Sequence, residues 1–282
     1  MSEFVPGVAG GGMQGVSMKI VIAGQYKSGT TAILTKIRSA MPASTLVLFE
    51  PRGYEASTAS DVLAKILIDN PDYVDFASFD SFDRKILIVR DPRDNMVSRV
   101  LYRIFEHPDF CLDDDKVAQF VGLLRKKEAD PKSVSLLELI GLFNRLKGVD
   151  TLGRLTKRAT RGLEFHAERP DYFVYRYEDL VQSAFAPLES YLGLRLTHGA
   201  ATVDRAVGRV TRTKGSGDWR NWFLEADVAF FRPHFATYME HYGYGVDWSA
   251  AENPVVRPDH ASEYVLRLVQ EKRTGSKAQA AS

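Results

Sequence analysis

The residues with the clearest capacity for chemistry are those of Gln25 to Thr31, QYKSGTT. They follow a short β-branched apolar run, Lys19 to Ala23, which Gly24 interrupts, and precede an apolar-periodic stretch, Ala32 to Met41. The segment therefore joins an expected strand to an expected helix. Unpaired backbone N–H groups and the positive end of the helix dipole converge at such a junction and favour an anion there. The pattern predicts recognition of a phosphate-like group, and the alternative is a plain tight turn.

The lysine of this loop has an unusual position. Gly24 and Gly29 are separated by four residues, as in a Walker A loop, but Thr30 occupies the position of the Walker lysine. Lys27 lies instead in the middle of the loop, where its ammonium could approach the bridging oxygen of a leaving group. Because a nucleoside triphosphate site needs a lysine at the start of the helix, this arrangement argues against a γ-phosphate.

A second set of phosphate-binding residue types follows another expected strand. Lys85 to Val89, KILIV, leads into Arg90, and Ser98 lies eight residues further on, within an expected helix from Pro92 to Phe105. An arginine at a strand end and a hydroxyl in the next helix can hold one phosphate through charge-assisted hydrogen bonds. The same segment also fits ordinary helix capping with Asp91 as N-cap, so on its own it leaves both interpretations open.

The remaining elements indicate an α/β fold with a central parallel sheet flanked by helices. Two further strands are expected at Thr45 to Phe49 and Tyr172 to Tyr175. Helices are expected at 58–68, 184–192, 200–209 and 225–241, together with a helical insertion over 106–170 that would wall an acceptor pocket. Because ligands of such sheets lie beyond the carboxyl ends of the strands, the loops after the strands should converge on one site.

Length and composition fit one globular domain. The chain has 282 residues, 45% of them hydrophobic and 26% charged, with a net charge of +1. Global electrostatics therefore support neither nucleic acid nor a membrane surface as a partner. We expect a flexible leader over 1–17, one domain over 18–270 and a flexible tail over 271–282.

The cysteine and histidine content and the N-terminal sequence indicate which cofactors and which location to expect. The single cysteine, Cys111, excludes an internal disulfide, and the 6 histidines lack paired ligand spacing, so no metal is expected. No apolar run approaches a membrane span, and the N-terminus does not have the pattern of a secretory signal. A cytoplasmic protein is predicted.

Three of these segments together resemble one family. The core Lys27 to Thr31, KSGTT, resembles the 5′-phosphosulfate loop of the sulfotransferases that use 3′-phosphoadenosine-5′-phosphosulfate (PAPS), with Tyr26 in place of the family's proline. The strand before Arg90 is similar to the family's 3′-phosphate segment. Thr211 to Trp219, TRTKGSGDW, is similar to its Arg-Lys-Gly loop before Gly-Asp-Trp. The matches follow in the family's order over 19–245.

The resemblance implies a P-loop-like three-layer fold and transfer of a sulfuryl group from PAPS, with 3′-phosphoadenosine-5′-phosphate (PAP) as product and no metal. Lys27 would stabilise negative charge on the departing phosphate. The 5′-phosphate would bind Ser28, Gly29, Thr30 and Thr31. The 3′-phosphate and adenine would bind Arg90, Ser98, Tyr177, Arg212, Lys214 and Gly215. An alignment on Gly-Asp-Trp places Arg212 without a gap, whereas Lys214 and Gly215 are shifted by one residue.

The base for the acceptor's proton is predicted from a weaker similarity. Cytosolic members use a histidine in a Lys-Thr-His segment, and the region 77–83, where it is expected, contains no histidine. Leu48 to Pro51, LFEP, is similar to the Phe-Glu-Pro segment of carbohydrate sulfotransferases, so Glu50 is the predicted base. Asp80, His107 and His166 are the alternatives.

Other functions and several details stay open. The acceptor could be a small molecule, a carbohydrate or a lipid, and the protein a monomer or a homodimer. A P-loop kinase or nucleotidase using ATP and magnesium, with Asp91 as a magnesium ligand, is one alternative. A non-catalytic nucleotide-binding module is another.

Overall fold

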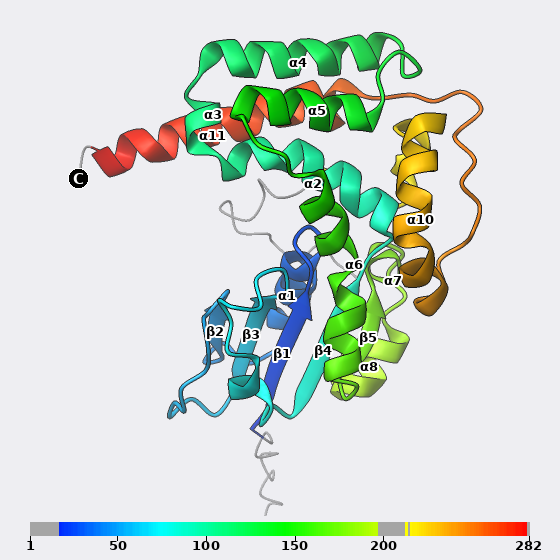
Figure 1. Ribbon diagram of the computed structural model, residues 1–282. Helices are drawn as coiled ribbons and strands as arrows, with labels where there is room; N and C mark the ends of the chain where they lie inside the picture. Colours follow the sequence, from blue (N-terminus) through cyan, green and yellow to red (C-terminus); the bar gives the residue numbers. More distant parts are fainter. Residues whose placement is uncertain (1–16, 197–211, 214, 281–282) are drawn as a thin grey trace, which may run out of the picture.

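The centre of the molecule is a parallel sheet of five strands in the order β2-β3-β1-β4-β5 (Figure 1). The computed structural model describes residues 17–196, 212–213 and 215–280, with side chains as far as residue 275. The strands are β1 (Lys19–Gly24), β2 (Leu46–Phe49), β3 (Val62–Leu67), β4 (Arg84–Val89) and β5 (Phe173–Arg176). β1 pairs with β3 on one side and β4 on the other, so the loop after β1 leaves the middle of the sheet.

Helices cover both faces of this sheet. Alternate residues of β1 point to opposite faces: Ile20 and Ile22 pack in one apolar cluster, and Val21 and Ala23 in the other. The first cluster includes α1 (Thr30–Arg38) and α8 (Ala186–Leu192). The second includes residues of α2 (Pro92–Glu106), α6 (Leu152–Glu168) and α10 (Glu225–His241). The expected three-layer α/β architecture is confirmed.

A layer of helices lies beyond the carboxyl ends of the strands (Figure 1). It contains α3 (Pro108–Cys111), α4 (Asp114–Ala129), α5 (Leu136–Lys147) and α11 (Ser262–Ala280), packed with α2. Short elements complete the described chain: α7 (Tyr177–Val181), η1 (Phe76–Phe79), η2 (Asp218–Asn221) and η3 (Pro258–His260). The helical insertion expected over 106–170 is confirmed, since α3 to α6 separate β4 and α2 from β5.

The start of α2 follows the predicted capping sequence. The Asp91 carboxylate accepts a hydrogen bond from the backbone N–H of Arg93 at 2.9 Å, and Pro92 occupies the first helical position. Capping and phosphate binding do not exclude each other here, because Asp91 caps the helix while Arg90 projects from the strand end before it.

The helix expected at 58–68 is wrong. Val62–Leu67 forms β3 between β1 and β2. Its residues from Val62 to Ile66 are all buried, including Lys65. A strand buried on both faces has no alternation of apolar and polar residues, so its apolar run can resemble one side of a helix.

The C-terminal end also differs from the expectation. The tail expected from Glu271 is part of α11, which continues to Ala280. Tyr264, Val265, Leu268 and Val269 are buried at helical spacing, and this pattern could have identified the helix. Most of the leader expected over 1–17 and the helix expected at 200–209 lie outside the described residues. Within those residues, no helix has both the length and the apolarity to cross a bilayer.

Candidate functional site

The loop between β1 and α1 is open to an anion at its helix end. The Ser28 N–H bonds back to the Gln25 carbonyl at 3.0 Å, and Lys27 adopts a left-handed backbone with φ of 64°. Gly29 is the N-cap of α1 with φ of 96°, and no side chain caps the helix there. The first-turn N–H groups of α1, which begins with Thr30 and Thr31, are therefore available to a bound anion.

Neighbouring elements hold this loop in place. The Gln25 amide donates to the Arg158 carbonyl of α6 at 2.9 Å and accepts from the Tyr238 hydroxyl of α10 at 3.0 Å. The Asn95 amide of α2 donates to the Tyr26 carbonyl at 3.0 Å, and the Tyr26 N–H bonds to Asp69 after β3. Because contacts from four other segments fix this loop, it is preorganised before any ligand arrives.

Lys27 is a buried cation between two aromatic residues. Its Nζ lies 3.9 Å from the ring centroid of Tyr102 and 3.5 Å from the hydroxyl oxygen of Tyr264 on α11. Burial holds the pKa of Lys27 well below its usual range, and the nearby charges of Arg90 and Arg212 lower it further. An anion bound beside Lys27 would offset both the burial of its charge and the repulsion from the two arginines. Tyr264 was not predicted to belong to the site, because α11 was not recognised.

Arg90 extends from the end of β4 to the loop. Its Nη1 donates to the backbone carbonyl of Lys27 at 3.0 Å, and its guanidinium lies 4.3 Å from the ring centroid of Tyr177. The Tyr177 ring also lies against Gly29, where an added Cβ would stand 2.3 Å from the ring. The structure thus brings together Lys27, Gly29, Arg90 and Tyr177, which were predicted from three separate segments.

Arg212 approaches the same cluster from the Gly-Asp-Trp segment. Its Nη1 donates to Asp218 at 2.6 Å, and Asp218 also accepts from the Trp222 indole at 3.1 Å. Within the described chain, the Nε and Nη2 of Arg212 and the Nε of Arg90 are buried without a hydrogen-bond partner. Buried donors usually have partners, so these guanidinium nitrogens fit a phosphate group that binds between them.

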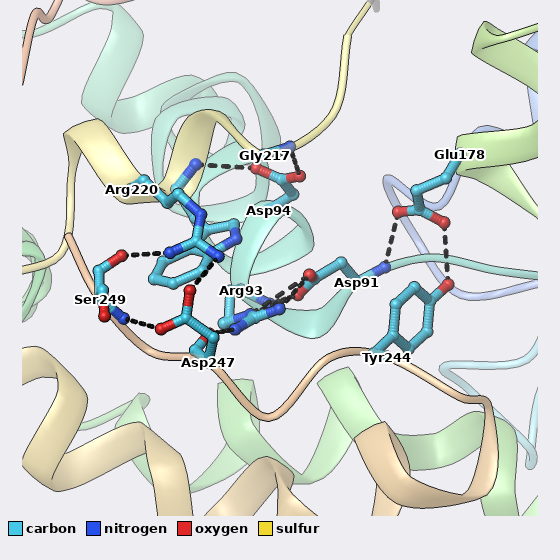
Figure 2. A network of polar contacts seen from close by, with 10 residues as sticks. Asp91, Arg93, Asp94, Glu178, Gly217, Arg220, Tyr244, Asp247 and Ser249 are labelled. Carbon is cyan, nitrogen blue, oxygen red and sulfur yellow. Dashed lines mark hydrogen bonds and ion pairs between the residues drawn. The ribbon is translucent and has the colours of Figure 1, made fainter. Parts of the chain in front are cut away.

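A polar network fixes the two arginine segments relative to each other (Figure 2). The Asp94 carboxylate on α2 accepts from the N–H groups of Gly217 and Trp219 at 2.6 and 2.9 Å. The Asp91 N–H donates to Glu178 at 3.0 Å, and Glu178 accepts from the Tyr244 hydroxyl at 2.9 Å.

Arg93 completes this network. It forms an ion pair with Asp91 at 2.7 Å (Figure 2). Its guanidinium also lies 4.0 Å from the Trp219 ring centroid. Burial raises the pKa of the Asp94 carboxyl, while Arg90 opposes that shift. The network therefore aligns the strand end that carries Arg90 with the segment that carries Arg212.

The other residues that were predicted to bind the donor lie in different surroundings. Ser98 is buried on α2. The Ser28 hydroxyl donates to the Gln25 carbonyl at 2.6 Å. Gly215 lines a shallow pocket of about 420 Å³ together with residues of the Gly-Asp-Trp segment and His260. Lys214 lies outside the described residues.

Glu50 lies next to the first turn of α1, away from the contacts of Lys27. It directly follows β2, has a φ of 54° and forms an ion pair with Lys65 of β3. The Lys65 Nζ also donates to the Thr31 hydroxyl at 3.2 Å. Burial lowers the pKa of Lys65, and Glu50 opposes that shift. Lys65 was missed because its segment was taken for a helix, although a single lysine within an apolar run is a recognisable signal.

The alternative bases are separate from this cluster. Asp80 is exposed after η1, His107 caps α3, and His166 lies 5.8 Å from His241, ring centroid to ring centroid. Glu106, which was not predicted, is closer: the Tyr26 hydroxyl lowers the pKa of its carboxyl against the rise that burial causes, and the charge of Glu106 opposes the lowered pKa of Lys27. Within the described residues, no group of three or more His, Cys, Asp or Glu side chains could hold a metal ion.

Comparison with solved structures finds similar chains, whereas the comparisons with sequences find none. No protein-family model and no curated protein matches the chain. A crystal structure of mouse sulfotransferase SULT7A1 complexed with PAP aligns over 79% of this chain and 85% of that chain, with 19% sequence identity and a TM-score of 0.47. At this level of similarity, function has to be argued from the residues of the site.

Proposed function

We propose that the protein is a sulfotransferase that moves a sulfuryl group from PAPS to an acceptor hydroxyl by in-line displacement. One observation carries the proposal: the mid-loop Lys27 lies in one cationic cluster with Arg90 and Arg212, beside an uncapped helix N-terminus. A ligand with phosphates at two separated positions matches that charge distribution. The Lys-Ser-Gly-Thr-Thr resemblance supports the same donor.

The residues fit such a donor at both ends. The N–H groups at Gly29, Thr30 and Thr31 would hold the 5′-phosphate, as at other helix N-termini. The unpartnered guanidinium nitrogens of Arg90 and Arg212 would hold the 3′-phosphate. Ser98, Tyr177, Lys214 and Gly215 belong to the proposal as further contacts to that end. Binding energy at the 3′-phosphate would keep the donor in register at the reacting end.

Lys27 would act on the leaving group. PAPS supplies a sulfuryl group already activated by its bond to the 5′-phosphate. In the transfer, the acceptor oxygen forms a bond to sulfur, the bond from sulfur to the phosphate oxygen breaks, and its electron pair stays on the phosphate. Lys27, held between Tyr102 and Tyr264, would stabilise that developing charge without needing to move.

Glu50 is the proposed base for the acceptor proton. Its Oε1 is paired with Lys65, and its side chain keeps 39% exposure, so the carboxylate is both oriented and accessible. Through Lys65 and Thr31 it is tied to the first turn of α1, where the 5′-phosphate would bind. The proton would pass to Glu50 as the bond to sulfur forms.

The decisive comparison is between PAP and ATP with magnesium as stabilising ligands. A ligand that binds the native state alone raises the apparent melting temperature. The proposal predicts that PAP raises Tm and that ATP with magnesium does so far less. A kinase or nucleotidase would give the opposite order. A non-catalytic module would bind PAP, yet Lys27→Ala would leave every measured activity unchanged.

A further inference from the structure

Four arginines lie close together on the two packed helices α2 and α6. Arg99 and Arg103 are separated by one helical turn on α2, and Arg154 and Arg158 by one turn on α6. The two helices pack together, and the charges of Arg99, Arg154 and Arg158 all act on Arg103. We call these four residues the arginine cluster.

The carboxylates nearby do not balance this charge. Arg99 is paired with Asp69 at 2.6 Å, so that carboxylate is already engaged. Arg158 donates to the Asn70 amide oxygen at 2.8 Å, which is a neutral acceptor. Among the described residues, Arg103, Arg154 and Arg158 have no carboxylate within ion-pair distance, and Glu106 is the remaining acidic group whose charge acts on Arg103.

Arg103 is the most enclosed member of the cluster. It is 9% exposed, its guanidinium lies 4.9 Å from the Phe143 ring centroid, and its Nε has no hydrogen-bond partner within the described chain. Burial lowers the pKa of Arg103, and Arg154, Arg158 and Arg99 lower it further against the opposing charge of Glu106. A buried, partly unpaired guanidinium beside like charges costs free energy that a bound oxyanion would recover.

The cluster borders the proposed transfer site. Tyr102, next to Arg103 in the chain, lies against the Lys27 ammonium. Glu106, one helical turn beyond Arg103, lies close enough to the Tyr26 hydroxyl for each group to shift the pKa of the other. Asp69 joins Arg99 to the N–H of Tyr26, so the cluster and the loop share one set of contacts.

We propose that the arginine cluster binds an oxyanionic group of the acceptor, a carboxylate, phosphate or sulfate, so that the acceptor is an anionic molecule with a free hydroxyl. The inference rests on the proposed sulfotransferase function. It restricts the acceptor to molecules that carry both groups within one small scaffold. A guanidinium fork binds such oxyanions with two parallel hydrogen bonds, which also orients the hydroxyl toward the transfer site.

The test is calorimetric titration of the PAP-loaded protein with matched pairs of probes. One pair is 4-hydroxybenzoate and 4-hydroxybenzamide, and the other is glucose 6-phosphate and glucose. At least one anionic probe should bind, and its neutral partner about tenfold more weakly or not at all. If no anionic probe binds, or if each neutral partner binds equally well, the inference is wrong.

Substitutions of single arginines test whether the anionic probes bind at the arginine cluster. Arg154→Gln changes an exposed residue, so it should fold normally and weaken the anionic probe about tenfold, and Arg103→Gln should do the same where it folds. Arg195→Gln, at a side chain 95% exposed, is the matched control and should leave binding unchanged. Unaltered affinity in Arg154→Gln would overturn the inference.

Two further titrations distinguish an acceptor site from a free-ion site and from a failure of the donor assignment. If inorganic phosphate or sulfate binds the cluster as tightly as the anionic probes, the site holds a free ion and the acceptor assignment fails. If PAP does not stabilise the protein, the proposal that PAPS is the donor is wrong, whatever the arginine cluster binds. Titrations without PAP then still decide whether the cluster binds oxyanions.

Discussion

Arg90 and Lys27 are joined through the main chain, because the Arg90 Nη1 donates to the Lys27 carbonyl at 3.0 Å. The same arginine lowers the pKa of the Lys27 ammonium. One side chain therefore both shapes the loop that would hold the 5′-phosphate and would contribute positive charge at the proposed 3′-phosphate end. The proposed function thus predicts that the two ends are mechanically and electrostatically coupled.

Replacing Lys27 with an uncharged residue should lower activity without lowering stability. Lys27→Met deletes a buried cation whose lowered pKa shows that the folded protein disfavours its charge. We expect the unfolding free energy at neutral pH to stay equal or rise, while kcat falls about a hundredfold or more. Urea unfolding and turnover of PAPS measure the two effects. A variant with normal kcat would remove Lys27 from the mechanism.

Binding of PAP should be coupled to proton uptake. Because the folded-state pKa of Lys27 is lowered, the unfolded chain binds more protons up to the ordinary lysine pKa of about 10.4. Stability of the free protein should therefore rise with pH through that window. Bound phosphate would restore the Lys27 pKa, so the loop would take up a proton on binding.

Calorimetry of PAP binding in buffers of different ionisation enthalpy measures this uptake. A pH series from about 8 to 10 avoids titration of the phosphate itself, whose second pKa is about 6. Wild type should take up protons within that series, and Lys27→Met should take up none. Equal uptake in the two proteins would mean that another group titrates.

Gly29 should not tolerate a side chain. A Cβ there would stand 2.3 Å from the Tyr177 ring, and the φ of 96° disfavours any L-residue. Gly29→Ala should lower the unfolding free energy by about 1–3 kcal/mol and weaken PAP binding. In a Tyr177→Ala background the packing part of that loss should disappear, while the backbone part remains. An equal loss in both backgrounds would show that Tyr177 does not cause the conflict.

Glu50→Gln tests the proposed base while preserving shape. With the proton acceptor gone, kcat should fall about a hundredfold, and PAP binding should change little. Asp80→Asn, at an exposed residue away from the cluster, is the matched control. If Glu50→Gln turns over at close to the wild-type rate, Glu50 is not the base, and Glu106 is then the next candidate for that role.

The parts of the site that depend on local sequence were predictable. The loop around Lys27 follows from a strand, a glycine boundary and a helix start, all within a few residues. The capping of α2 at Asp91 is likewise local and is confirmed. Five parallel strands with helices on both faces follow from alternating elements, apart from β3.

The parts that depend on packing were not predictable. Lys65 stands out as a single lysine in an apolar run, but its contacts with Glu50 and Thr31 could not be predicted until β3 was placed between β1 and β2, because burial on both faces removes the strand's periodicity. Tyr264 reaches Lys27 from a helix more than two hundred residues away in sequence, and nothing local indicates that contact. The position of Glu106 near the loop depends on the packing of α2 against that loop, so the sequence alone could not indicate it.

Recognition of both phosphates of PAP is the central requirement of the proposed function. Calorimetric titration with PAP and with 5′-AMP measures the contribution of the 3′-phosphate directly. We predict that wild type binds PAP about a hundredfold more tightly than 5′-AMP, and that Arg90→Gln and Arg212→Gln each remove most of that preference. Equal affinity of wild type for PAP and 5′-AMP would contradict the assignment.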